Sequence, residues 1–177
     1  VVLDAAPSSL HRLTPTQYRQ TVRDLLGLPD AAVAEIALPA DEGGLPSLLT
    51  VSKLGDAAAD LVSRGAHRKL VSCDINGAGT TECATKFMTD FGSKAFRHPV
   101  TPDEGRWLSQ VYTAARSKFG FSESLDVVAR VILQSPQVLY VHEDGEPGEG
   151  LPDGLLRVGQ YERASRLSYL LWDSMPD

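Results

Sequence analysis

Two cysteines have the most specific chemistry in this chain of 177 residues. Cys73 and Cys83 flank a glycine-containing connector of nine residues, which could let their Cα atoms approach to disulfide distance. We predict an oxidised pair; the alternative is two reduced thiols in the core. A disulfide would imply an extracytoplasmic location, because oxidising compartments preserve such bonds. The sequence has no CxxC or CxxCH motif, so it encodes neither a redox-active dithiol nor a covalent haem attachment.

The histidines do not have the spacing of a metal site. Two ligands share one helical face in an HxxxH or HExxH pattern, and neither pattern occurs among the four histidines, which are His11, His67, His98 and His142. We therefore predict no metal site. GxSxG and P-loop motifs are also absent, and nothing in the sequence marks a Ser-His-Asp triad. A self-contained hydrolase is consequently the weakest functional hypothesis, since it needs a cleft that holds a nucleophile beside a base.

Three arginines could tie helices together. Arg97, Arg163 and Arg166 lie on or beside apolar helix faces, where a planar guanidinium makes several hydrogen bonds or meets an anionic group. We predict that these arginines tie helices together; anion binding is the alternative. Carboxylates are concentrated in residues 143–153, where they could bind a cation, but a charged run between helices is usually solvated. We predict a solvated loop there.

Helices must position most of these residues, because apolar residues recur at helical spacing and no long strand-like alternation occurs. Thr14 and Thr101 each precede a proline in a capping signal, and Ser122 is a candidate cap for a later helix. We predict an all-α protein, an irregular bundle of about six helices with long Pro/Gly-rich loops. The predicted helices run from Pro15 to before Gly27, over 52–70 and 81–97, from Pro102 to before 119, from Ser122 to before Pro136, and over 159–172.

Composition bounds the class of protein. With 42% apolar and 23% charged residues the chain is typical of a folded protein and unlike a disordered one. Its formal net charge of -6 argues against nucleic acid or an anionic membrane as the main partner. No apolar run approaches the roughly 20 residues of a membrane-spanning helix. We divide the chain into an N-terminal helix with a wrapping loop (1–50), a central helical module (51–142), and an acidic loop that begins a further helical domain (143–177).

The two ends of the sequence are unusual. Residue 1 is not Met, and neither a basic nor an apolar leader segment follows it, so we expect either that a leader was removed or that the sequence starts inside a longer protein. Residues 174–177, SMPD, are typical of the start of another helix; a trimmed or frayed tail is the alternative. We expect this chain not to cover the apolar side chains of its last helix, so that their neighbour lies outside residues 1–177. That helix carries Tyr161, Ala164, Leu167, Leu171 and Trp172.

Four segments together resemble a known family. Residues 13–27, LTPTQYRQTVRDLLG, resemble the opening module RLTRxEYxNTVRDLLG of large secreted proteins of planctomycetes and myxobacteria. Residues 91–101, FGSKAFRHPVT, are similar to the motif FGxRAFRRPLT, and residues 133–140, LQSPQVLY, to LxSPxFLYR. Residues 164–177, ASRLSYLLWDSMPD, are similar to ASRLSYFLWSSMPD. These motifs occur in family order over most of the chain. Such families are tandem domains of unknown function whose later domains often carry CxxCH, the motif of c-type haem.

The resemblance implies a helical, non-haem portion of a periplasmic or cell-surface c-type cytochrome-like redox protein, secreted or lipid-anchored upstream. This portion would bind no haem covalently and would pack against a haem-bearing portion, either the remainder of the same precursor or a second chain. If a haem lies against this chain, the resemblance places five residues nearest to it, as propionate partners or packing groups: Arg97, His98, Tyr140, Arg166 and Trp172. The alternative function is a structural or binding module that engages a polymer or partner protein through its loops at 37–50 and 143–157.

Overall fold

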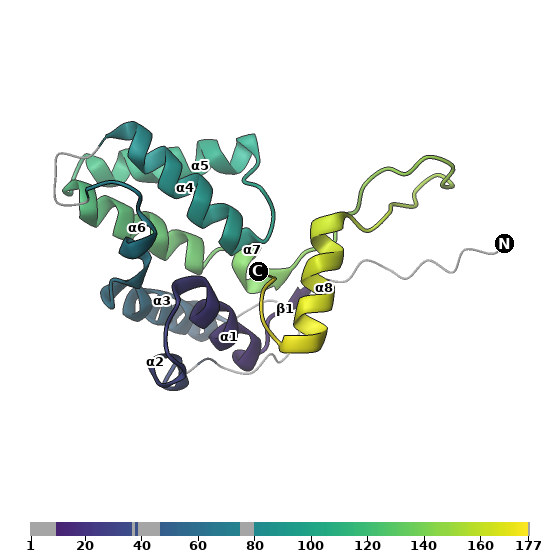
Figure 1. Ribbon diagram of the computed structural model, residues 1–177, viewed down its shortest axis with the longest axis horizontal. Coiled ribbons are helices and arrows are strands. Elements are labelled where there is room, and N and C mark those ends of the chain that lie inside the picture. The colour runs from purple at the N-terminus through teal and green to yellow at the C-terminus, as the bar shows by residue number, and fades with distance from the viewer. Residues whose placement is uncertain (1–9, 37, 39–46, 75–79, 177) are drawn as a thin grey trace.

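A computed structural model describes residues 10–36, 38, 47–74 and 80–176. These residues form eight α-helices, six of them with seven or more residues, and one 3-10 helix (Figure 1). The protein is therefore all-α, as predicted. The helices are α1 (Pro15–Leu26), α2 (Asp30–Ala34), α3 (Leu48–Ser63), η1 (Ala66–Leu70, 3-10), α4 (Thr81–Phe96), α5 (Pro102–Arg116), α6 (Phe121–Leu133), α7 (Pro136–Leu139) and α8 (Gln160–Trp172).

The two Thr-Pro signals begin helices as predicted. In α1 and α5 the threonine side chain accepts a hydrogen bond from the third helical residue, and that residue's own side chain bonds back to the threonine N–H. Gly27 ends α1 in the left-handed conformation, with φ of 61°. Sequence signals at helix ends therefore fix both boundaries of α1.

One hydrophobic core joins the long helices. Phe87 and Phe91 of α4 stack with ring centroids 5.3 Å apart, and α4 contacts both α5 and α6, while α6 also packs on α3. Figure 1 shows these four helices grouped together, and α1 packs with α2. The core extends from Leu13 to Tyr169 along the chain. The largest fully buried side chains include Tyr18, Leu61, Phe87, Phe91, Leu108, Leu125, Ile132 and Leu133.

A short antiparallel sheet closes the fold between distant parts of the chain. Strand β1 (His11–Arg12) pairs with β2 (Tyr140–Val141), so that His11 lies opposite Val141. The sheet places the segment after α7 against the residues that lead into α1. Because each strand has only two residues, the sequence contains no alternation that could predict it.

Three boundaries in two of the predicted helices are wrong. The helix predicted over 52–70 begins earlier, at Leu48 behind the cap Ser47, and it ends at Ser63, because Gly65 adopts φ of 70° and a separate 3-10 turn follows. Ser122 does not cap α6. That helix begins one residue earlier, at Phe121, because the Phe121 ring is buried against Tyr112 in an edge-to-face contact.

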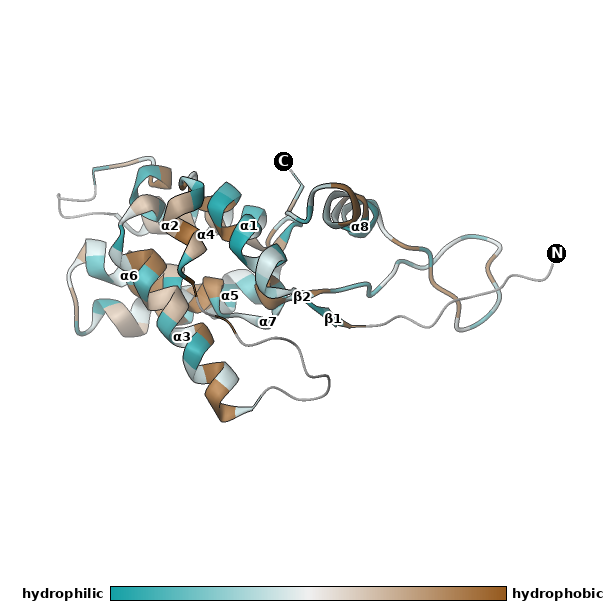
Figure 2. Cartoon of the chain, turned by 90° about the horizontal axis from the view of Figure 1, so that it is seen from below, coloured by the Kyte–Doolittle hydropathy of each residue, from teal (hydrophilic) through white to brown (hydrophobic). Residues whose placement is uncertain are grey.

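The C-terminal part of the chain stands apart from the bundle. Figure 1 shows α8 beyond α1 and α7, and the loop between β2 and α8 projects beyond the helices in both Figure 1 and Figure 2. We call residues 143–157 of this loop the acidic arm. Its base is closed by two backbone hydrogen bonds between Glu146 and Arg157, and the Glu162 carboxylate accepts the N–H groups of Gly145 and Gly159.

Several predictions concern residues outside the described part of the chain. The loop at 37–50 and the connector at 72–80 are described only in part, and residues 1–9 and 177 not at all. In the parts that are described, no helix combines the length and apolar character needed to cross a bilayer.

The predicted cysteine pair is present. Cys73 and Cys83 form a disulfide with their Cα atoms 6.2 Å apart. Cys83 lies in the first turn of α4, where its N–H donates to the cap Thr80. The bond therefore fixes the start of α4 to the segment that follows η1.

A buried histidine of η1 contacts an aspartate of α6. His67 of η1 is fully buried against Phe87, and its Nε2 lies 2.7 Å from Oδ1 of Asp126 in α6. Arg68 binds the same carboxylate. Burial raises the pKa of Asp126, but the hydrogen bonds and positive charges of Arg68 and His67 outweigh burial and hold this pKa below its usual value. Nδ1 of His67 is buried with no hydrogen-bond partner among the described residues. Burial is the largest influence on His67 and lowers its pKa, and Asp126 only partly opposes it.

We predict that stability falls as the pH drops below about 6.5, the ordinary histidine pKa. Because the folded His67 resists protonation, the unfolded chain binds more protons in this range, and acid favours unfolding. Urea unfolding at pH 7.5 and 5.5 measures the effect. The loss of stability between pH 7.5 and 5.5 should be smaller in the variant His67→Gln than in the wild type. In the control His142→Gln it should equal the wild-type loss. An equal fall in all three proteins would contradict the prediction.

Candidate functional site

Arg97 ends α4 in an unusual conformation. Its φ of 65° lies in the left-handed region, where a residue with a Cβ costs about 1–2 kcal/mol relative to ordinary helical geometry. Its side chain is nevertheless buried, with 7% of the residue exposed. A glycine would relieve the backbone at this position, so the arginine side chain must supply a compensating interaction.

That interaction is a set of four hydrogen bonds to neutral oxygens. Nη2 of Arg97 donates to the carbonyls of Gln137 and Tyr140, both at 2.6 Å. Nη1 donates to the carbonyl of Val138 and to the Tyr169 hydroxyl, both at 3.2 Å. The carbonyls lie at the C-terminal end of α7, where the helix dipole favours a cation. Burial lowers the pKa of Arg97 below its usual value, but the guanidinium stays charged at neutral pH.

Tyr169 extends this cluster to the first helix. Its ring lies under the guanidinium, with the Arg97 Cζ 5.6 Å from the ring centroid, and its hydroxyl is 2.9 Å from Oγ1 of Thr21. The buried cluster of Arg97, Tyr169 and Thr21 therefore joins α4, α7, α8 and α1. Tyr169 was not predicted as a functional residue; the only sequence signal is its place between the serines and leucines of the last motif.

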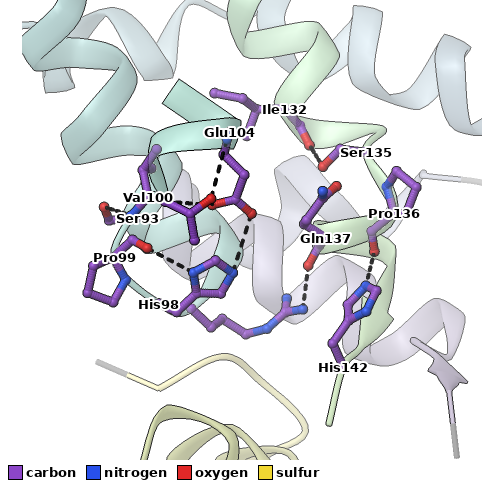
Figure 3. A network of polar contacts seen from close by, with 12 residues as sticks. Ser93, His98, Pro99, Val100, Glu104, Ile132, Ser135, Pro136, Gln137 and His142 are labelled. Atoms are coloured by element: carbon purple, nitrogen blue, oxygen red, sulfur yellow. Dashed lines mark hydrogen bonds and ion pairs between the residues drawn. The ribbon is translucent and has the colours of Figure 1, made fainter. Parts of the chain in front are cut away.

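His98 lies at the edge of this cluster. Its Nδ1 is 2.9 Å from the carbonyl of Pro99, and its Nε2 is 3.6 Å from Oε1 of Glu104 (Figure 3). The ring also lies 6.1 Å from that of Phe96. Figure 3 shows His142 on the other side of Gln137, with its Nε2 3.2 Å from the carbonyl of Pro136. Both histidines are thus held by backbone carbonyls beside α7.

A cleft of about 490 Å³ opens between these histidines and the acidic arm. Arg97 lies at its floor, and acidic and imidazole side chains line its walls: His98, Glu104, His142, Asp144, Glu146 and Glu162. Glu162 and Glu104 already bind backbone N–H groups, which occupies part of their acceptor capacity. In the described ranges no three His, Cys, Asp or Glu side chains are placed to hold a metal ion.

The remaining predicted site residues lie apart from this cleft. Arg166 makes a two-point contact with Glu143, at 2.8 and 2.5 Å, which fixes the start of the acidic arm to α8. Tyr140 binds Arg97 through its carbonyl, and its ring is 6.5 Å from that of His142. Trp172 lies at the far end of α8 and lines a different groove of about 500 Å³ together with Arg23 and Leu167.

The structure brings only some of these five residues together. Arg97 and His98 line the cleft, and the guanidinium of Arg97 is surrounded by carbonyls. Arg166 is paired with Glu143, and Trp172 lines the separate groove. Trp172 is the exposed aromatic member of the predicted set.

The large apolar side chains of α8 are mostly exposed to solvent. Within the described residues, α8 buries Ser165, Ser168 and Tyr169, which face α1 and Arg97. We call the four large apolar residues on the rest of the helix the α8 face. Their exposed fractions are 56% for Leu167, 76% for Leu170, 63% for Leu171 and 67% for Trp172. The expectation that this chain leaves its last helix uncovered agrees with these values.

Two grooves run along the inner edge of α8. The groove beside Trp172 shares Asp24, Ala164 and Met175 with a second groove of about 510 Å³, which also includes Lys94 and Tyr161. Ser174 donates to Asp24 at 2.5 Å, so the residues after α8 return to α1 between the grooves. The helix is thus attached to α1 at Tyr169 and at its C-terminal end, and it is attached to the acidic arm at Glu162 and Arg166.

Comparison with known families gives two matches in tandem. Residues 11–45 match the model of PSD3, a protein of unknown function (DUF1587), and residues 83–143 match that of PSD5, a protein of unknown function (DUF1595). No curated protein and no solved structure matches the chain. The first match falls within the segment predicted as 1–50, and the second ends where the acidic arm begins. The two matches follow one another along the chain, which is consistent with the tandem domains of unknown function that the motifs resemble.

Proposed function

We propose that this chain is the helical, non-haem portion of an extracytoplasmic c-type cytochrome-like redox protein, and that the α8 face packs against the haem-bearing portion. The observation that carries the proposal is the exposure of Leu167, Leu170, Leu171 and Trp172 on one helix. Burying a large apolar side chain is favourable by about 1.5–3 kcal/mol, so four neighbouring ones form an effective docking surface.

Other features support the same proposal. The Cys73–Cys83 disulfide fits an oxidising compartment. The two matches in tandem agree with the resemblance to proteins whose later domains carry haem. The chain's own polar cluster is used in joining helices, because Arg97 binds backbone carbonyls and Tyr169 binds Thr21. In this proposal the chain shapes the surroundings of the haem and does not itself carry out a reaction.

A c-type haem bound in the neighbouring portion would supply one-electron transfer. The contribution of this chain would be to cover one side of that portion and exclude water from it. Trp172 is the predicted residue best placed to contact the neighbour, because its ring is exposed at the end of the α8 face. Arg97 would act indirectly, by holding Tyr169 and therefore α8 in position.

The test uses the full-length protein and two photoreactive variants. A benzoylphenylalanine at position 170 is expected to cross-link to the haem-bearing portion, because Leu170 is the most exposed residue of the α8 face. The same group at position 119, an exposed phenylalanine between α5 and α6, is the matched control and should give at least about tenfold less product. Mass spectrometry locates the adducts, and a visible spectrum of the intact protein detects the haem.

Two results would contradict the proposal. A full-length protein without a haem absorption band would remove the redox function. Equal cross-linking from positions 119 and 170 would remove the docking role of α8. A haem-free protein in which position 170 still cross-links selectively would instead favour the alternative, a binding module for a partner protein.

A further inference from the structure

We propose that the surface that meets α8 is a protein surface with an apolar centre ringed by lysine and arginine side chains. This inference rests on the proposed function, because it specifies the chemistry of the partner that the α8 face contacts. It arises from the charge distribution, which the proposed function does not use.

The negative charge of the chain is concentrated at its C-terminal end. Residues 143–177 contain eight carboxylates and three arginines, which gives a net charge of -5. Residues 1–142 contain 15 carboxylates and 14 basic side chains, which gives a net charge of -1. The bundle is thus close to neutral, and the segment that carries the α8 face holds almost the whole charge of the protein.

Exposed carboxylates lie on the segments before and after the apolar residues of α8. Glu149 and Asp153 are exposed on the acidic arm, which leads into the N-terminal end of α8 and projects beyond the helices (Figure 1). Asp173 is exposed at the other end of the helix, directly after Trp172. No ion pair within the described residues neutralises Glu149 or Asp153.

The basic side chains of this segment offset its negative charge only partly. Arg166 is paired with Glu143, so these two charges cancel. Arg163 is exposed on α8 itself, and Arg157 lies at the base of the acidic arm. Six other carboxylates remain in the described residues of the segment: Asp144, Glu146, Glu149, Asp153, Glu162 and Asp173. The C-terminal segment that carries the α8 face is therefore acidic at neutral pH.

This combination selects the class of partner. Apolar contact supplies the affinity, and opposite charge around it orients the approach and disfavours wrong partners. An anionic membrane or a nucleic acid would be repelled, since both carry negative charge. Exposed charges act over about 8 Å at physiological ionic strength, which is sufficient for groups that rim a contact.

Zero-length carbodiimide coupling in the full-length protein tests the inference. The reagent joins a carboxylate to a lysine amine only where the two are in contact. We expect links from Glu149 and Asp153 to lysines outside residues 1–177, and none from Asp56, an exposed carboxylate on α3. The yield of the cross-link from benzoylphenylalanine at position 170 should fall about fivefold in 0.5 M NaCl. It should fall by a similar factor in the double variant Glu149→Gln/Asp153→Asn. The matched variant Asp56→Asn should leave it unchanged.

The outcomes separate the two proposals. If position 170 still cross-links selectively but the arm carboxylates give no links and salt has no effect, the docking function stands and the basic partner is wrong. If neither reagent links the C-terminal segment to another portion, both proposals are wrong. Links only to lysines of a second copy of this chain would also overturn the inference, because they indicate self-association.

Discussion

Replacing Arg97 by alanine is expected to lower the free energy of unfolding by about 3–5 kcal/mol. The change removes four hydrogen bonds and leaves the carbonyls of Gln137, Val138 and Tyr140 buried without their donor. It also separates Tyr169 from α4. Because the contacts join α4, α7 and α8, the loss should affect the global unfolding transition. A shift of at least about 6 °C in the melting temperature would accompany it.

Two further variants separate the side chain from the backbone. Arg97→Gly should be about 1 kcal/mol less destabilising than Arg97→Ala, because glycine adopts the left-handed conformation at φ of 65° without strain. Arg97→Lys should recover only part of the loss, since an ammonium cannot reproduce the planar arrangement of four donated bonds. Urea denaturation followed by circular dichroism measures all three. An alanine variant within about 1 kcal/mol of the wild type would contradict the structural role of Arg97.

Removing the disulfide is expected to destabilise the protein by about 2.5–3 kcal/mol, the chain-entropy value for so short a loop. The double variant Cys73→Ala/Cys83→Ala avoids burying a new hydroxyl at Cys83, which is largely enclosed. Urea unfolding of the wild type with and without dithiothreitol supplies an independent measurement. Reductant should lower the wild-type midpoint to that of the double variant.

The double variant is itself the control for the reductant. Dithiothreitol should not change its unfolding midpoint, because it has no bond to reduce. If reductant also leaves the wild type unchanged, and mass spectrometry finds two free thiols in the native protein, the cysteines are the reduced pair that was the alternative prediction.

The sequence predicts the helices well where their ends carry their own signals. Thr14 and Thr101 act through side chains that bond to residues three positions away, so local sequence is sufficient to place α1 and α5. Ser122 fails as a cap because a tertiary contact, the burial of Phe121 on Tyr112, moves the start of α6. Gly65 separates α3 from η1 because its φ is positive. The helical spacing of the apolar residues around it gives no sign of this break.

The candidate site was less predictable, because its chemistry is largely in the main chain. Arg97 is identified by its residue type and its place beside an apolar face, but its partners are carbonyls of residues 40–43 positions away. A carbonyl has no sequence signature. The exposure of the apolar residues of α8 was expected, but the residues by which the helix packs were not, since serines and a tyrosine face the bundle, opposite to the usual amphipathic arrangement.

The attachment of α8 has a consequence for how the protein could adapt to a neighbour. The helix is held by the Tyr169 hydroxyl, by Asp173 accepting from Gln17 at 3.3 Å, and by Ser174 on Asp24. Of the three residues that α8 buries, Tyr169 alone carries a ring, so separation of α8 from α1 would exchange these bonds for bonds to water and would uncover that ring. The fit of α8 to a contacting surface is therefore limited mainly by the place of Tyr169 beside Thr21 and Arg97.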